Sequence, residues 1–344
     1  MKTLTLKETF FLITISIFSF AVNMLWIGTN RFNQPLNIDE AGYLSISLSD
    51  YHQLLANGIY GWLSTVDGPS IQAPLTTAVT SLFYLVFGTN AYTGFIVISC
   101  FAVWVIIGTY LLGKAHGGVR LGVISSLLVA SCPMFFRYET DYIFAIPAAA
   151  MTTMALLSLV KCNSFTNMRY AVFFGLFAGA MLLARTMTIA FVPFLFLGAF
   201  ASIVVHPGNL KRQFGLLLLA AILALMIAAT WFIPNGMLVF HYLSSYGYGH
   251  NATGYANEHF SKSIVSVIGK YFILFQPKAW LDHLNHLSKL LYFPDVIIII
   301  SGGLLLLVSI LISTGKNGIR NTSLLVVKSK LCLLYTSDAA DERS

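Results

Sequence analysis

The sequence has very little charge for its length. Of its 344 residues, 10% are Asp, Glu, Lys or Arg, whereas 57% are hydrophobic, and the mean hydropathy is +0.78. Soluble domains carry about 25% charged residues. The composition therefore excludes an ordinary soluble domain and favours a polytopic membrane protein. The net charge of +7 would also suit a nucleic-acid partner, but Lys and Arg in a membrane protein mainly report its orientation. We expect no nucleic-acid partner.

Motifs for metal binding and redox chemistry are also missing. The four cysteines stand far apart in the chain, and none belongs to a Cys-x-x-Cys or Cys/His pattern. The eight histidines form no His-Glu-x-x-His motif. The sequence therefore predicts no metal site, and we expect the protein to need no cofactor.

Long apolar segments are what the chain has in abundance. A helix needs about 20 apolar residues to cross a bilayer. Eight segments approach this length, at 10–28, 91–113, 119–136, 142–160, 169–184, 187–205, 214–233 and 295–315. The first lacks the cleavage site of a signal peptide and is expected to be retained. A further run, 74–88, is short for a span and is expected to lie at the membrane interface. The predicted fold class is an all-α polytopic membrane protein with a transmembrane helix bundle.

Basic residues predict the orientation of these spans. Lys2 and Lys7 precede the first span, and most other Lys and Arg lie in the connections 113–120, 161–169, 206–213 and 315–320. If the eight spans alternate, all of these sites lie on the cytoplasmic side. The external side of the membrane then receives a large first loop, two short turns and a later long segment, 234–294. We expect a bacterial cytoplasmic-membrane protein whose chemistry takes place at the external face.

The end of the chain changes character. Residues 331–344 pass from apolar into acidic and polar sequence, which resembles the translated adaptor read-through found at the ends of some gene fragments. We exclude this tail from the fold. Residues 323–327 look like the beginning of another span. We therefore expect one membrane domain over residues 1–330, in a native chain that continues further.

Asp39 and Glu40 stand together just after the first span. Apolar and aromatic residues follow them at helical spacing as far as Gly58, which predicts an amphipathic helix at the membrane surface. Acidic residues are favoured in the first turn of a helix, and Asp is a common N-cap. A structural role would thus explain the pair. The other interpretation is a catalytic site at the membrane surface.

Other charged residues fall in turns on the same predicted face. Arg137 and Asp141 lie between two spans, and Arg185 separates two apolar runs. Charges at the mouth of a bundle usually face its interior or a water-filled cavity, although Arg185 could also extend to the interface from a helix end. Two acidic sites and two arginines around one cavity would suit a base acting beside a phosphorylated ligand.

The motif "IDEAGY" after the first span resembles the Asp-Glu motif of the GT-C glycosyltransferases that use polyprenyl-phosphate sugars. The likeness is strongest to the protein O-mannosyltransferase and aminoarabinose transferase group (glycosyltransferase family 39-like). Further segments match this group in the same order, at 69–94, 133–157, 175–195 and 231–256. The resemblance covers roughly residues 8–314.

The resemblance implies roles for several residues. Asp39 would be the catalytic base, and Glu40 would stand beside it. The candidates for binding the donor phosphate or the acceptor are Arg137, Asp141, Arg185, Gln72 and Tyr248. The family's Lys-Pro-Pro and Thr-Lys-Gly motifs read Gln72-Ala73-Pro74 and Ala184-Arg185-Thr186 here, and these departures leave the donor sugar open.

The reaction implied is the transfer of a hexose or pentose to an acceptor hydroxyl, with inversion. The leaving group is a phosphate, which needs cations rather than an acid. The expected partners are a polyprenyl-phosphate sugar, membrane lipids and an acceptor that is a glycan, a lipid or a protein. A transporter or flippase of lipid-linked sugars is an alternative, but its charges would lie near the middle of the membrane in broken helices. A non-catalytic scaffold whose large first loop is a docking surface also stays open.

Overall fold

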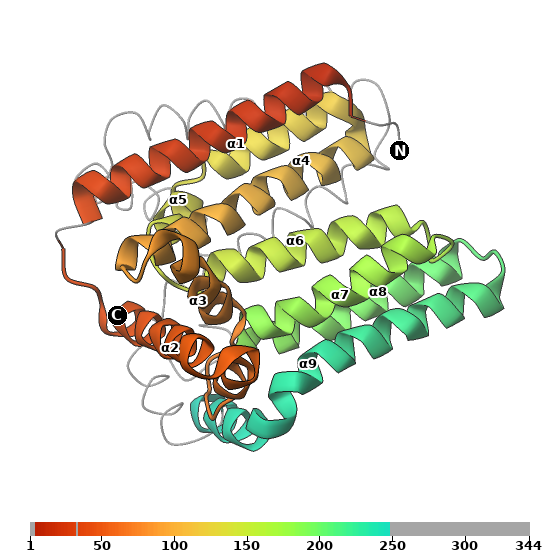
Figure 1. Ribbon diagram of the computed structural model, residues 1–344. Coiled ribbons are helices and arrows are strands. Elements are labelled where there is room, and N and C mark those ends of the chain that lie inside the picture. The colour runs from red at the N-terminus through yellow and green to blue at the C-terminus, as the bar shows by residue number, and fades with distance from the viewer. Residues whose placement is uncertain (1–3, 32–33, 248–344) are drawn as a thin grey trace, which may run out of the picture. The chain divides into compact units, whose positions relative to one another are not determined.

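Helices make up the regular structure of residues 4–31 and 34–247, which the computed structural model describes (Figure 1). The elements are α1 Leu6–Trp26, the π-helical turn η1 Ile27–Arg31, α2 Ile38–Val66, α3 Leu75–Phe87, α4 Ala91–Ala130, α5 Pro133–Glu139, α6 Ala145–Cys162, α7 Met168–Ala184, the 3₁₀ turn η2 Thr186–Ala190, α8 Val192–Val205 and α9 Leu210–Gly247.

Five helical segments of the described chain are long and apolar enough to span a membrane. They are Leu6–Arg31, Ala91–Ala130, Ala145–Cys162, Thr186–Val205 and Leu210–Tyr242. The helices α3 and α7 are apolar but shorter. The predicted class, an all-α polytopic membrane protein, is confirmed. The interfacial position expected for 74–88, which forms α3, stays a prediction.

The element α4 is a helical hairpin rather than one straight helix. Its backbone leaves the helical conformation at Gly117 and Gly118, and Gly118 has a φ of +78°, which favours glycine. The two arms then pack closely, because a Cβ added at Gly113 would lie 2.9 Å from the Cα of Gly122. The second arm ends at Ala130, and Pro133 starts α5. The predicted continuous span 119–136 was therefore wrong, since Pro133 cannot donate a backbone hydrogen bond within a helix.

The basic turns at 113–120, 161–169 and 206–213 lie at one end of the helix bundle, while the fourth, 315–320, lies outside the described residues. The Lys114 ammonium is 2.6 Å from a Glu8 carboxylate oxygen, which joins the turn of α4 to the start of α1. Gln213 donates a hydrogen bond of 2.7 Å to the carbonyl of Ser164, which joins the α8–α9 turn to the α6–α7 turn. Figure 1 shows these turns together, with α2 and α3 at the opposite end. This grouping agrees with the predicted alternation of spans, while the cytoplasmic assignment of that end stays a prediction.

Small residues bring α7 and α9 into close contact. A Cβ added at Gly175 would lie 2.5 Å from the carbonyl oxygen of Ala220, and one at Gly179 would lie 2.9 Å from that of Ala224. Such contacts are typical of membrane helices, whose association depends on close packing. They fix the end of α7, where Arg185 follows.

The residues up to Asn235 belong to one compact unit, and Gly236 begins a second. The site described below lies within the first unit. Tyr248, the span expected at 295–315 and the tail expected at 331–344 lie outside the described residues.

Candidate functional site

A capping box begins α2. The side-chain Oδ1 atom of Asn37 accepts a hydrogen bond of 2.8 Å from the backbone amide of Glu40. In return, the Glu40 carboxylate accepts one of 3.0 Å from the backbone amide of Asn37. Asn37 is therefore the N-cap, and the cap position considered for Asp39 was wrong. Asn37 takes that position because Glu40, three residues later, completes the reciprocal pair. Asp39 lies in the first turn with an exposed side chain, whereas Glu40 is fully buried.

The buried Glu40 belongs to a small ionic cluster. Arg31, the last residue of η1, donates a hydrogen bond to Glu40 and lies 3.6 Å from a carboxylate oxygen of Asp141. The Tyr142 amide donates a hydrogen bond of 3.0 Å to the second Glu40 oxygen. The structure thus brings together Glu40 and Asp141, two predicted site residues, through an arginine that the sequence analysis did not select.

The sequence does contain a feature that points to Arg31 as the partner of Glu40. It is the only basic residue between the first span and the Asp-Glu motif. Buried carboxylates in proteins are usually paired with a cation. A search for the partner of Glu40 among nearby basic residues would therefore have reached Arg31.

The two predicted phosphate-binding arginines, Arg137 and Arg185, lie at the ends of α5 and α7. The Arg137 side chain is exposed near the end of α5, and it forms no ion pair within 4.0 Å among the described residues. Arg185 is half-buried in extended backbone between α7 and η2. The next residue, Thr186, donates a hydrogen bond of 3.1 Å to the carbonyl of Ile71. The backbone at Arg185 and Thr186 therefore lies beside the loop that carries Gln72.

The loop between α2 and α3, residues 67–74, is also fastened to α9. The buried Asn235 accepts a hydrogen bond of 2.9 Å from the Ser70 amide and donates one of 3.2 Å to the carbonyl of Asp67. The backbone amide of Gln72 donates a hydrogen bond of 2.9 Å to the Ser70 hydroxyl. A loop with these fixed contacts can present side chains at defined positions.

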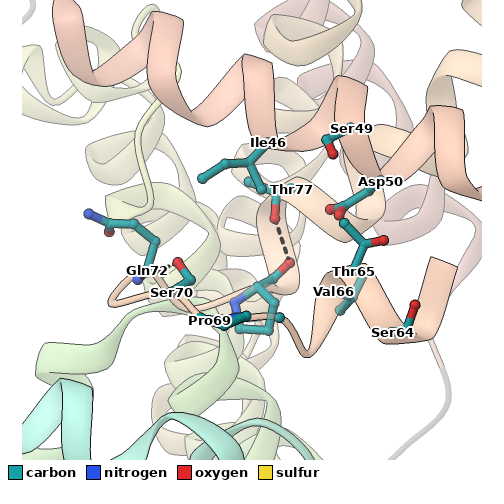
Figure 2. Close-up of a pocket in the computed structure, with 12 residues that line it drawn as sticks. Ile46, Ser49, Asp50, Ser64, Thr65, Val66, Pro69, Ser70, Gln72 and Thr77 are labelled. Atoms are coloured by element: carbon teal, nitrogen blue, oxygen red, sulfur yellow. Dashed lines mark hydrogen bonds between the residues drawn. The ribbon is translucent and has the colours of Figure 1, made fainter. Parts of the chain in front are cut away.

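A cavity of about 360 Å³ lies between this loop and α2 (Figure 2). Its lining residues are Ile46, Ser49, Asp50, Ser64, Thr65, Val66, Gly68, Pro69, Ser70, Gln72, Pro74 and Thr77. Of the predicted site residues, Gln72 is the one that lines it.

Asp50 also lines the cavity and was missed by the sequence analysis. It is fully buried, neither carboxylate oxygen has a hydrogen-bond partner among the described residues, and burial raises its pKa to about 7. The buried residues of α2 are Glu40, Leu44, Ser47 and Asp50. Their spacing of three or four residues is a helical face, so the pattern that predicted the helix also contained a signal for Asp50.

In the part of the chain that the structure describes, no group of three or more His, Cys, Asp or Glu side chains is arranged to hold a metal ion. Glu40 and Asp141 are bridged by Arg31 instead.

No protein-family model matches the chain, and no curated protein matches it. Two solved structures of ArnT from Cupriavidus metallidurans do resemble it. The apo structure has 16% sequence identity and a TM-score of 0.50, and covers 70% of this chain and 43% of ArnT. The structure bound to undecaprenyl phosphate has 14% identity and a TM-score of 0.52, and covers 70% of this chain and 44% of ArnT. The chain thus spans less than half the length of ArnT. At sequence identities this low, the likeness shows only a shared fold. The chain has the GT-C membrane helical fold of ArnT.

Proposed function

We propose that this chain is the catalytic part of a membrane glycosyltransferase that moves a sugar from a polyprenyl phosphate to an acceptor hydroxyl at the external face. One observation carries the proposal. In a fold shared with ArnT, which has been solved with undecaprenyl phosphate, the Asp-Glu pair begins a helix at the end of the bundle opposite the basic turns.

The different surroundings of the two carboxylates divide their roles. Both Glu40 oxygens already accept hydrogen bonds, from Arg31 and Asn37 on one side and from Tyr142 on the other. Glu40 is therefore a positioning residue that holds the start of α2. The exposed Asp39 carboxylate is open to a substrate, and we assign it as the general base.

The transfer is a single displacement. The acceptor oxygen forms a bond to the anomeric carbon as its proton passes to Asp39. The bond between that carbon and the phosphate oxygen breaks, and the lipid phosphate leaves with the electron pair. Attack from the side opposite the leaving group inverts the anomeric configuration. A positioned general base contributes about 10²- to 10⁴-fold to such a rate.

The leaving phosphate needs positive charge nearby. Arg185 is our first candidate, because its backbone is fixed beside the loop that carries Gln72. Arg137 is the second, on the exposed side of α5. Asp141 shares Arg31 with Glu40 and helps to position that arginine. Tyr248 stays a candidate for sugar stacking from outside the described residues.

The experiment is a donor-turnover assay on the purified protein in lipid nanodiscs. Polyprenyl phosphates carrying different radiolabelled sugars are supplied with a membrane extract as the source of acceptor, and free polyprenyl phosphate is measured. Its release together with labelled acceptor supports the proposal. Movement of the intact donor across a vesicle membrane without release would instead support the transporter or flippase.

A further inference from the structure

The cavity between α2 and residues 67–74 has an open side and a buried side. Ser49, Ser64 and Pro69 are exposed, whereas Asp50 and Thr77 are buried. At about 30 Å³ for each water molecule in the liquid, a volume of about 360 Å³ holds roughly a dozen waters. The cavity can therefore admit a small organic group from the surface.

The Asp50 carboxylate in this cavity is not satisfied by any hydrogen bond from the described residues. Both of its oxygens are buried. Buried polar groups are nearly always satisfied in folded proteins, and an unsatisfied one costs stability. Figure 2 shows Asp50 on one segment of α2, near Thr65 of the segment beyond the break at Gly58. A ligand that donates hydrogen bonds would satisfy this carboxylate.

The remaining lining residues define the chemistry of that ligand. They provide hydroxyl groups and one amide, at Ser49, Ser64, Thr65, Ser70, Thr77 and Gln72, and the lining set contains no Lys, Arg or His. A phosphate or carboxylate would meet Asp50 without a compensating cation. Hydroxyl groups both donate and accept hydrogen bonds, so they match a ligand that is itself rich in hydroxyls. Ile46, Val66 and Pro74 offer apolar surface to the carbon face of such a ligand.

The cavity is also connected to the ionic cluster at the start of α2. The Tyr142 amide binds Glu40, and the Tyr142 hydroxyl donates a hydrogen bond of 2.7 Å to Thr80 of α3 and lies 3.0 Å from the Ser47 hydroxyl of α2. Ser47 and Thr80 are each three residues from a lining residue, Asp50 and Thr77. The same two helices therefore carry the cavity and the proposed catalytic end of α2.

We propose that this cavity binds a neutral sugar unit and that Asp50 accepts hydrogen bonds from its hydroxyl groups. The inference rests on the proposed function and deepens it, because it names the class of sugar and a specificity residue. The bound unit is either the sugar of the lipid donor or a terminal sugar of the acceptor. Apart from Asp50, the lining set contains no charged side chain, so most of the cavity offers hydrogen-bonding groups that suit an uncharged ligand.

The first test measures binding without any turnover. Methyl glucoside, methyl mannoside and glucosamine are added to the protein in lipid nanodiscs, since sugar-based detergents would compete. A ligand that binds the folded state raises the unfolding temperature. We expect a rise with a neutral methyl glycoside, and no rise when Asp50→Asn or Ser49→Trp, which fills the exposed side, replaces the wild-type protein. Asp67→Asn is the matched control, because it makes the same chemical change on a residue outside the lining set.

The second test uses the transfer assay. Losing a hydrogen bond to a buried charge should raise one KM about 10- to 100-fold in Asp50→Asn, with a smaller change in kcat. A higher KM for the donor assigns the cavity to the donor sugar, and a higher KM for the acceptor assigns it to the acceptor. Stabilisation by glucosamine alone would overturn the choice of a neutral sugar. Unchanged binding and unchanged KM values in both Asp50→Asn and Ser49→Trp would overturn the site. Absence of turnover in the wild type would contradict the proposed function, while the glycoside-binding result would still decide the inference.

Discussion

Arg31 donates a hydrogen bond to the buried carboxylate of Glu40, and this contact holds the end of the first membrane helix against the start of α2. The two residues are nine positions apart in sequence. Asp141 approaches the same guanidinium from the link between α5 and α6. The position of the Asp-Glu motif therefore depends on ionic contacts among three parts of the chain.

Replacing Arg31 should destabilise the protein strongly. Arg31→Met removes the cation that contacts both Glu40 and Asp141, and removing one member of a buried ion pair typically costs about 3–5 kcal/mol. The measurement is thermal or denaturant unfolding in nanodiscs. Arg137→Met is the control, since a substitution at that exposed side chain should change the stability by no more than about 0.5 kcal/mol. Equal stability of the two variants would show that the Arg31–Glu40 contact does not hold α2.

The pKa of Asp50 predicts a change of stability with pH. The folded-state pKa is about 7 against an ordinary value of 3.8, so the folded protein binds the extra proton between about pH 4 and pH 7. Stability should therefore fall as the pH rises through this window, and the full cost should be present above pH 7. Asp50→Asn removes the cost, and should raise stability at pH 8 by of order 1–4 kcal/mol with little effect near pH 4.

Only the difference between Asp50→Asn and the wild type isolates this effect. Glu139 is also buried, and burial raises its pKa to about 8, so it contributes a slope of the same sign in both proteins. Unfolding curves at pH 4, 6 and 8 provide the comparison. A gap between the two proteins that does not grow with pH would contradict the burial of a charged Asp50.

Asn235 should control the order of the loop at residues 67–74. Asn235→Ala removes the partners of the Ser70 amide and the Asp67 carbonyl, which would cost about 1–3 kcal/mol if both groups stay buried. Hydrogen exchange at the Ser70 amide should become faster. Thr230→Ala, which removes an exposed side chain on the same helix, should leave that exchange rate as in the wild type. Comparable exchange in both variants would mean that Asn235 does not fasten the loop.

Two glycines test the packing of the bundle. Gly175→Ala places a Cβ 2.5 Å from a backbone oxygen of α9, whereas a Cβ at Gly198 of α8 meets nothing within 4 Å. The first substitution forces the helices apart and should cost about 1–3 kcal/mol. Gly198→Ala should be neutral or slightly stabilising, because Ala favours helix. Unfolding temperatures of the two variants give the comparison, and an equal effect would contradict the α7–α9 contact.

The sequence predicted the parts of the fold that depend on hydropathy and local spacing. The apolar segments up to residue 233 fall on helices, with the break before Pro133 as the exception, and the amphipathic helix after Asp39 is α2. The three basic turns within the described residues lie at one end of the bundle, in agreement with the predicted alternation of spans. These features could be predicted because each follows from residues close together in the chain.

The site was harder to predict because its contacts join distant residues. Glu40 and Asp141 were both selected, but the cation between them was not, since nothing local reveals which arginine reaches a buried carboxylate. Asp50 looked like an ordinary polar residue of an amphipathic helix, and its burial depends on α3 and the loop at residues 67–74. The roles of Asp39, Arg137, Arg185 and Gln72 stay proposals that rest on chemistry and resemblance.

The central claim is that Asp39 is the base of a sugar-transfer reaction. Asp39→Asn tests it most directly, because Asn37 and Glu40 form the capping box without Asp39, and the helix should be preserved. The measurement is the rate of free polyprenyl phosphate release, with the unfolding temperature recorded on the same preparation. We predict a loss of at least about 10²-fold in rate with an unfolding temperature close to that of the wild type. Transfer at the wild-type rate by a folded Asp39→Asn protein would contradict the account.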